Sequence, residues 1–196
     1  MDIHTRYCTM RTKRARFSLI DCDPNTVILD DMLDALTHIP RFTGHSRISI
    51  LEHQIRAYLI AWHDLDIREP KLLKTILNHD SHEAYVADVS SPMKVLMRLM
   101  SEDGQTSDYD RIEARVGQAV AEALDLFWPH PDEVKEADLL ALAAEMDITW
   151  GTGTATESGL VLPSSGYFIG MSPINMRLEF MSIFKKLTAE QEVMYG

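Results

Sequence analysis

The chain has 196 residues, of which 45% are hydrophobic and 25% are charged, as is typical of a single globular domain with its own core. Nine glycines and eight prolines are too few for a disordered or collagen-like chain. The formal net charge of −11 argues against a dedicated nucleic-acid-binding protein, which normally carries a basic face. It does not exclude a phosphorylated substrate, because a small anion responds to the local field.

The sequence also lacks the marks of membrane and secreted proteins. Its longest apolar runs, such as residues 57–62, are far shorter than the roughly 20 residues that span a bilayer. Residues 1–17 contain no apolar stretch of a signal peptide. Cys8 and Cys22 are the two cysteines and lack CxxC spacing, so we expect neither a disulfide scaffold nor a cysteine metal site. These features predict a cytoplasmic protein whose partners include neither membranes nor nucleic acids.

Helical periodicity dominates the chain, without a strand-rich block or an internal repeat. The spacing of apolar residues predicts helices over residues 27–39, 48–63, 71–86, 111–127 and 133–148, and a last helix over about 173–187. The helix over 48–63 is apolar nearly all round, which indicates that it is buried. We therefore predict an all-α fold, a compact helical bundle that forms one domain over residues 1–196 with its core at about 27–148.

Two segments stand outside this helical pattern. Residues 151–170 hold five of the nine glycines and predict a long loop before the last helix, either a surface excursion, which we favour, or a substrate lid. The N-terminal segment carries a run of basic residues, for which a solvated arm is favoured over a reach toward a neighbouring subunit's triphosphate. The run consists of Arg6, Arg11, Lys13, Arg14 and Arg16.

Ionisable residues interrupt three of the predicted apolar helix faces. In the helix over 71–86 the apolar stripe should continue through positions 79, 80 and 83, where the sequence has His79, Asp80 and Glu83. His53 and Asp138 interrupt two other apolar helices in the same way. A buried carboxylate costs several kcal/mol unless it is paired or bound to a metal. These residues therefore need partners.

One divalent cation would compensate two imidazoles and two carboxylates together. Imidazole and carboxylate ligands accommodate Mn, Fe, Co, Ni or Zn, with further positions left to water and substrate. The alternative is a set of core histidines and buried ion pairs, which we would prefer for His53 alone. For the adjacent His79-Asp80 pair together with His53 and Asp138, we favour the metal.

The order of these residues and their neighbours resembles that of the HD-domain phosphohydrolases, over about residues 5–148. The similarity is to the compact branch that includes bacterial 5'-deoxynucleotidases and phage dATP triphosphohydrolases, and it implies a helical HD-domain bundle. The matching motifs, in chain order, are Arg41-Phe42-x-x-His45, Glu52-His53, His79-Asp80-Ser81-His82-Glu83, Asp88, Ser91-Pro92-Met93-Lys94 and Lys135-Glu136-Ala137-Asp138.

The resemblance assigns roles to the acidic residues and histidines of these motifs. It implies Glu83 as the activator of the attacking water, and Asp88 as a residue that positions the water or protonates the leaving oxygen. For Asp88, an ordinary cap or turn residue is the alternative. The implied metal ligands are His53, His79, Asp80 and Asp138, the same four residues selected by the burial argument.

The resemblance also implies a set of substrate-binding residues. Arg41 corresponds to the family's phosphate-binding arginine, and a guanidinium fork suits phosphoryl oxygens. Phe42 stands where the bacterial deoxynucleotidases have Trp, so it can still stack on a base or sugar. Lys94 is a second candidate phosphate contact or a solvated lysine, while His45 either reaches phosphate or orients the turn that carries Arg41. We expect His82 to lie at the surface.

The expected function is metal-dependent hydrolysis of 2'-deoxynucleotides, with one divalent metal (Mn, Co, Fe, Ni, Zn or Mg) per subunit. The resemblance implies a homo-oligomer in a bacterial or phage-infected cytoplasm. It favours a dNTP triphosphohydrolase that releases deoxynucleoside and triphosphate, with dATP as substrate. A 5'-deoxyribonucleotidase that releases phosphate from dNMPs is the alternative. A non-catalytic nucleotide-binding sensor is a further alternative of another class.

Overall fold

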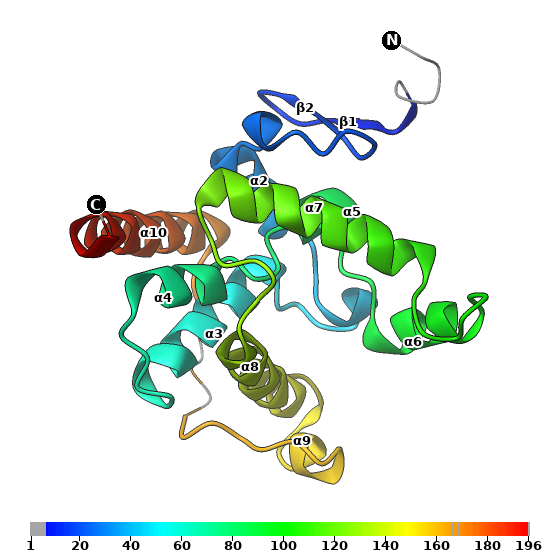
Figure 1. Ribbon diagram of the computed structural model, residues 1–196. Coiled ribbons are helices and arrows are strands. Elements are labelled where there is room, and N and C mark those ends of the chain that lie inside the picture. Colours follow the sequence, from blue (N-terminus) through cyan, green and yellow to red (C-terminus); the bar gives the residue numbers. More distant parts are fainter. Residues whose placement is uncertain (1–6, 166, 168, 196) are drawn as a thin grey trace.

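The computed structural model describes residues 7–165, 167 and 169–195, and most of this part of the chain is helical, as predicted (Figure 1). In chain order the elements are β1 (Thr9–Arg11), β2 (Arg16–Ser18), the 3-10 helix η1 (Pro24–Thr26), α2 (Leu29–Leu36), the 3-10 helix η2 (Phe42–Gly44), α3 (Ile50–His63), α4 (Pro70–Leu77), α5 (Glu83–Val86), α6 (Ser91–Leu99), α7 (Asp108–Leu124), α8 (Asp132–Trp150), α9 (Thr154–Glu157) and α10 (Pro173–Tyr195). Among the described residues, no helix is both long and apolar enough to cross a membrane.

Helix α3 occupies the centre of the core, as its apolar sequence predicts. It packs against α4, α8 and α10, and α10 also lies along α4 (Figure 1). Ile50, Leu51 and Ile60 of α3 are completely buried, and burial of each such side chain contributes about 1.5–3 kcal/mol. Ser49 begins the helix by accepting a hydrogen bond from the backbone N–H of Glu52. The polar residues of this helix are therefore held in a rigid element.

The predicted helix over 71–86 is wrong as a single element, because the structure divides it into α4 and α5. The side chain of Asn78 donates to a backbone carbonyl one turn earlier, at 2.8 Å. His79 Nδ1 donates to the carbonyl of Ile76, also at 2.8 Å. These side chains satisfy carbonyls that a continuing helix would have bonded, and α4 ends. Glu83 therefore begins a separate short helix instead of lying one turn beyond His79.

Other segments contain more structure than the sequence predicted. Helix α6, which begins at Ser91-Pro92, and the β1–β2 hairpin were not expected. Within the predicted loop over 151–170, Asp147 accepts hydrogen bonds from the backbone N–H groups of Gly153 and Ala155, which fixes α9. Helix α10 extends to Tyr195, beyond the expected end near 187. Of the glycines in the loop, Gly166 lies outside the described residues.

The basic N-terminal run binds to the chain's own helix α2. Lys13 pairs with Asp34, and Arg14 pairs with both Asp30 (2.5 Å) and Asp31 (2.6 Å). These contacts hold the hairpin against α2. The four described residues of the run are exposed, as expected of a solvated segment, and two of them are paired within the chain. Arg6 lies outside the described residues.

Candidate metal centre

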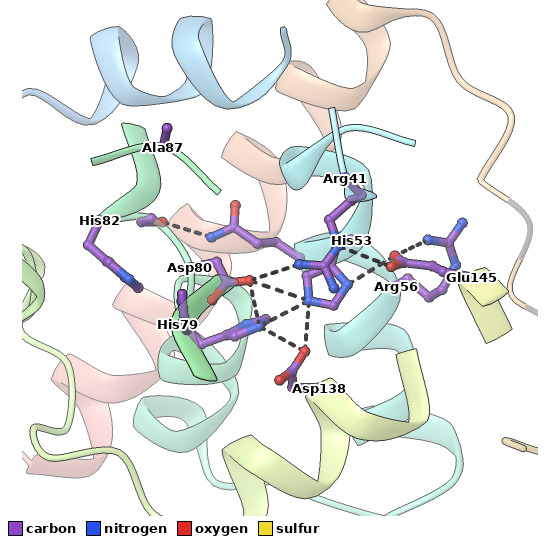
Figure 2. A network of polar contacts seen from close by, with 12 residues as sticks. Arg41, His53, Arg56, His79, Asp80, His82, Ala87, Asp138 and Glu145 are labelled. Carbon is purple, nitrogen blue, oxygen red and sulfur yellow. Dashed lines mark hydrogen bonds and ion pairs between the residues drawn. The ribbon is translucent and has the colours of Figure 1, made fainter. Parts of the chain in front are cut away.

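Two histidines and two aspartates from three separate segments converge at one point. His53 comes from α3, His79 and Asp80 from the turn between α4 and α5, and Asp138 from α8 (Figure 2). One ligand atom of each residue lies within 4.8 Å of every other. His53 Nε2 is 3.2 Å from His79 Nε2 and 3.0 Å from Asp138 Oδ1. The structure thus brings together the four residues that the sequence singled out.

The hydrogen bonds of the two Nδ1 atoms fix the orientation of both imidazole rings toward the cluster. His53 Nδ1 donates to Glu145 Oε1 at 2.9 Å, and His79 Nδ1 donates to the carbonyl of Ile76. A carboxylate or carbonyl can only accept, so each Nδ1 carries a proton. In the neutral rings both Nε2 atoms therefore present lone pairs to the carboxylates of Asp80 and Asp138 (Figure 2).

Such a convergence of lone pairs requires a positive charge at its centre. Burial alone lowers the pKa of His79, but the neighbouring carboxylates of Asp80 and Asp138 outweigh burial and raise that pKa well above its usual value. A proton on the ring is one way to supply the charge. A divalent cation is another, and imidazole and carboxylate ligands suit it. The four residues could therefore hold a metal ion.

Glu145 binds the ring nitrogen of His53 that points away from the cluster, and the sequence analysis did not predict it. This fully buried residue of α8 binds His53 through Oε1, which also accepts from Arg56 at 2.6 Å, and its Oε2 accepts from Arg41 at 3.2 Å (Figure 2). Burial raises the pKa of a carboxyl group, yet His53 and the two arginines outweigh it and hold the pKa of Glu145 at about 2. Glu145 is therefore an anion that fixes the ring of His53.

The signals for Glu145 and Arg56 were present in the sequence. Glu145 lies seven residues after Asp138 on the same helix and interrupts an apolar run, as Asp138 does. Arg56 lies three residues after His53 on the most apolar helix. The argument from buried charge that selected Asp138 applies equally to both.

Arg41 lies between Glu145 and the cluster. Its guanidinium NH1 is 3.6 Å from Asp80 Oδ2, and its side chain is 11% exposed. Burial disfavours the charged form, but Glu145, Asp80 and Asp88 raise the pKa of Arg41 above its ordinary value. A fixed cation therefore stands beside the candidate ligands, as expected for a phosphate contact.

Glu83 is a buried carboxylate with incomplete hydrogen bonding. It is 3% exposed, and its Oε2 has no hydrogen-bond partner among the described residues. Burial raises the pKa of Glu83 well above its usual value, and the charges of Asp80 and Asp88 raise it further. Asp88 follows Ala87, which has φ 63°, and burial raises the pKa of Asp88 too. Both carboxyl groups therefore favour the protonated form more than ordinary acids do.

Glu113 of α7 joins Lys94 and His82 next to Glu83. Lys94 Nζ donates to Glu113 Oε1 at 2.7 Å, and His82 Nε2 is 3.4 Å from the same oxygen. The expectation that His82 lies at the surface is wrong, because its side chain is 11% exposed and faces Glu113. His82, Glu83 and Glu113 lie close enough to form a second ligand group, but Lys94 already supplies their positive charge.

The remaining two predicted substrate residues lie elsewhere. Phe42 packs edge-on against Trp150 at the end of α8, with ring centroids 4.6 Å apart. His45 is exposed and lines a separate cavity of about 390 Å³ beside Thr149. Neither lines the cavity that reaches the metal cluster, and the same is true of Arg41, Glu83 and Asp88.

A cavity of about 480 Å³ opens directly onto the cluster. Its wall includes His79, Asp80 and Asp138. Trp128 and His130, from the segment between α7 and α8, line it as well. Its volume lies in the range of small-molecule binding sites. Lys94, His82 and Glu113 also belong to the wall.

Comparison with known protein families gives no match for this chain. The chain is 30% identical over 122 residues to a protein of Escherichia coli (strain K12) named "Uncharacterized protein YfdR", and the similar region covers 61% of this chain. The chain spans 59% of the length of that relative. The name of YfdR states no activity, so the similarity carries no function over to this protein.

Proposed function

We propose that the protein is a metal-dependent phosphohydrolase of the HD-domain type that acts on 2'-deoxynucleotides. The observation that carries the proposal is the convergence of four lone-pair ligands beside Glu83, a buried carboxyl group whose Oε2 is unpartnered among the described residues. A divalent cation bound by the four ligands would polarise a phosphoryl oxygen and lower the pKa of a water molecule.

The protein's own residues supply the rest of the chemistry. In the proposed reaction Glu83 accepts a proton from the water that attacks phosphorus, and the bond from phosphorus to the leaving oxygen breaks. The raised pKa of Asp88 suits a group that returns a proton to that oxygen. Arg41, held by Glu145, faces the charge that develops on the phosphoryl oxygens.

Lys94 provides a second cation for the phosphates, because Glu113 fixes its ammonium group next to Glu83. Arg41 and Lys94 are each paired with one glutamate, Glu145 and Glu113, and two such positions suit separate phosphates of one ligand. We therefore favour a dNTP, with dATP as the first candidate, over a dNMP. The expected products are deoxynucleoside and triphosphate.

Product analysis tests this function. The full-length protein is loaded with Mn²⁺, Co²⁺ or Mg²⁺, incubated with the four dNTPs and the four dNMPs, and the released phosphate and triphosphate are separated by ion chromatography. We expect triphosphate from dATP. Phosphate from dNMPs alone would establish a 5'-deoxyribonucleotidase instead. A panel that is inert with every metal would contradict the enzyme and favour a sensor.

A variant of Glu83 separates catalysis from metal binding. Because Glu83 acts as the base, Glu83→Gln should lower kcat by at least about 100-fold. Its metal content should equal that of the wild type, because Glu83 is outside the four-ligand group. Glu122→Gln, an exposed change on α7, is the matched control and should leave both quantities unchanged. Full activity in Glu83→Gln would refute the assigned role.

A further inference from the structure

The cavity beside the metal cluster is lined by two chemically different groups of residues. One group is charged and includes Asp80, Asp138 and Lys94. The other is aromatic and consists of Trp128 and His130, which lie edge-on to each other with ring centroids 4.9 Å apart. Charged and aromatic groups in one cavity match a ligand that carries both phosphates and a flat ring.

The packing of the Trp128 indole requires a glycine within α7, which lowers the stability of that helix. Gly117 lies in the middle of α7, where glycine costs about 1 kcal/mol relative to alanine. A Cβ atom at this position would lie 2.4 Å from the Trp128 ring, closer than any real contact. One edge of the indole therefore packs against the α7 backbone, while the residue remains 36% exposed at the cavity wall. An exposed, rigidly held aromatic ring is what a stacking contact needs.

His130 adds an uncharged polar group next to Trp128. Its burial is the main reason that its pKa falls to about 4, and the charges of His79 and His82 lower that pKa further. At neutral pH the ring is therefore neutral and offers one donor and one acceptor. Such a group suits the edge of a neutral heterocycle, whereas a phosphate would favour a cation.

We propose that Trp128 and His130 form a nucleobase subsite, in which the base of the deoxynucleotide stacks on the Trp128 indole while its phosphates face the metal cluster. This subsite deepens the proposed function and rests on it for the choice of a deoxynucleotide. It assigns base recognition to the segment between α7 and α8 and not to Phe42, whose ring packs edge-on against Trp150.

Tryptophan fluorescence gives a readout that does not depend on turnover. In a Glu83→Gln protein that also carries Trp62→Phe and Trp150→Phe, Trp128 is the remaining tryptophan of the chain. Titration with dATP in Mg²⁺ should quench its emission, because a stacked base contacts the indole directly. Inorganic triphosphate, which lacks a base, should bind without quenching. Calorimetric binding of dATP that leaves the emission unchanged would overturn the subsite.

Kinetics test the same claim independently. Trp128→Leu, which keeps an apolar side chain without an aromatic face, should raise the KM for dATP about 5- to 100-fold. The affinity for inorganic triphosphate, which has no base, should change by less than about twofold relative to the wild type, since stacking contributes nothing there. Trp62→Phe is the matched control, because Trp62 contacts Arg68 away from this cavity. An unchanged KM for dATP in Trp128→Leu would contradict the subsite.

If Trp128→Leu does not fold, His130→Ala keeps the Trp128–Gly117 contact and tests the same subsite. It should raise the KM for dATP and leave the affinity for inorganic triphosphate unaffected, whereas equal effects on both would count against the subsite. Failure of the subsite can be distinguished from failure of the proposed function. Hydrolysis of dATP without quenching of Trp128 removes the subsite and keeps the function, while quenching without hydrolysis by the wild type does the reverse.

Discussion

Glu145 joins three partners in the core. It accepts hydrogen bonds from His53, Arg56 and Arg41, and its carboxylate is completely buried. Arg56 also pairs with Glu52 one turn earlier. Orientation of a ligating histidine by a carboxylate on its other nitrogen is a common way to tune a metal site. At the residue scale, the candidate ligands therefore depend on a neighbour that touches no substrate.

Replacement of Glu145 by glutamine tests this dependence. The amide keeps the shape but loses the charge that holds His53 and the two arginines. We expect the affinity for Mn²⁺, measured by calorimetry, to fall about 10- to 100-fold. The free energy of unfolding in urea should fall by about 3 kcal/mol, because two buried guanidinium groups lose the counter-ion that they share.

The control is Glu133→Gln, an exposed change on the same helix, α8, which should alter neither quantity. A Glu145→Gln protein with wild-type affinity for Mn²⁺ would show that the ring of His53 needs no such support.

Helices with strong apolar periodicity could be predicted from the sequence, whereas a helix end that depends on side-chain hydrogen bonds could not. The apolar pattern identified α3 and α8 and the candidate ligands His53 and Asp138 on them. The same pattern did not predict the end of α4 at Leu77. The spacing of apolar residues does not show that the side chains of Asn78 and His79 bond to backbone carbonyls. Glu145 was missed because it lies outside the motif, although its side chain is completely buried whereas that of Asp138 is 36% exposed.

The packing of α7 against the following segment gives a prediction at the scale of elements. Gly117→Ala should gain about 1 kcal/mol of helix propensity. Overpacking against the Trp128 ring should cost about 1–3 kcal/mol, so we expect a net loss of stability and a shifted Trp128 emission. Gln118→Ala, at an exposed position of the same helix, is the control in urea unfolding. A Gly117→Ala protein more stable than the wild type would contradict this packing.

The start of α7 has a charge pattern that predicts pH dependence. Arg98 of α6 binds both carboxylate oxygens of Asp110, and Ser107 completes a capping box with it. The hydrogen bonds from Arg98 lower the pKa of Asp110 well below its usual value, and those from Ser107 act in the same direction. A carboxyl group with a lowered pKa in the folded state stabilises the fold above its unfolded pKa, and this contribution is lost as the pH falls through the folded pKa.

Asp110→Asn should therefore destabilise the protein at pH 7, by about 1 kcal/mol, the usual value of a cap. The difference from the wild type should shrink as the pH falls below about 4, the pKa of an unfolded aspartate. Urea unfolding of both proteins at pH 7, 5 and 3 measures it. A difference that is constant across this range would mean that the Asp110 charge does not contribute.

On the scale of the whole molecule, the candidate centre lies where α3, the α4–α5 turn and α8 meet (Figure 2). Its ligands are up to 85 positions apart in the sequence, from His53 to Asp138, so the site exists only in the folded chain. A cation that binds only the folded state stabilises it by mass action, by about 4 kcal/mol at 1,000 times the dissociation constant. For a chain of this size such a gain raises Tm by roughly 8–16 °C.

Counting the metal is the most direct test of this centre. The purified protein is stripped with a chelator, reloaded with Mn²⁺, Co²⁺ or Zn²⁺, freed of excess ion and measured by elemental mass spectrometry, with Tm recorded before and after. The four-ligand site predicts one ion per chain and a raised Tm in the wild type and in the control Glu136→Gln, and loss of both in Asp138→Asn. No stoichiometric metal in the wild type, or equal metal in Asp138→Asn, would contradict it.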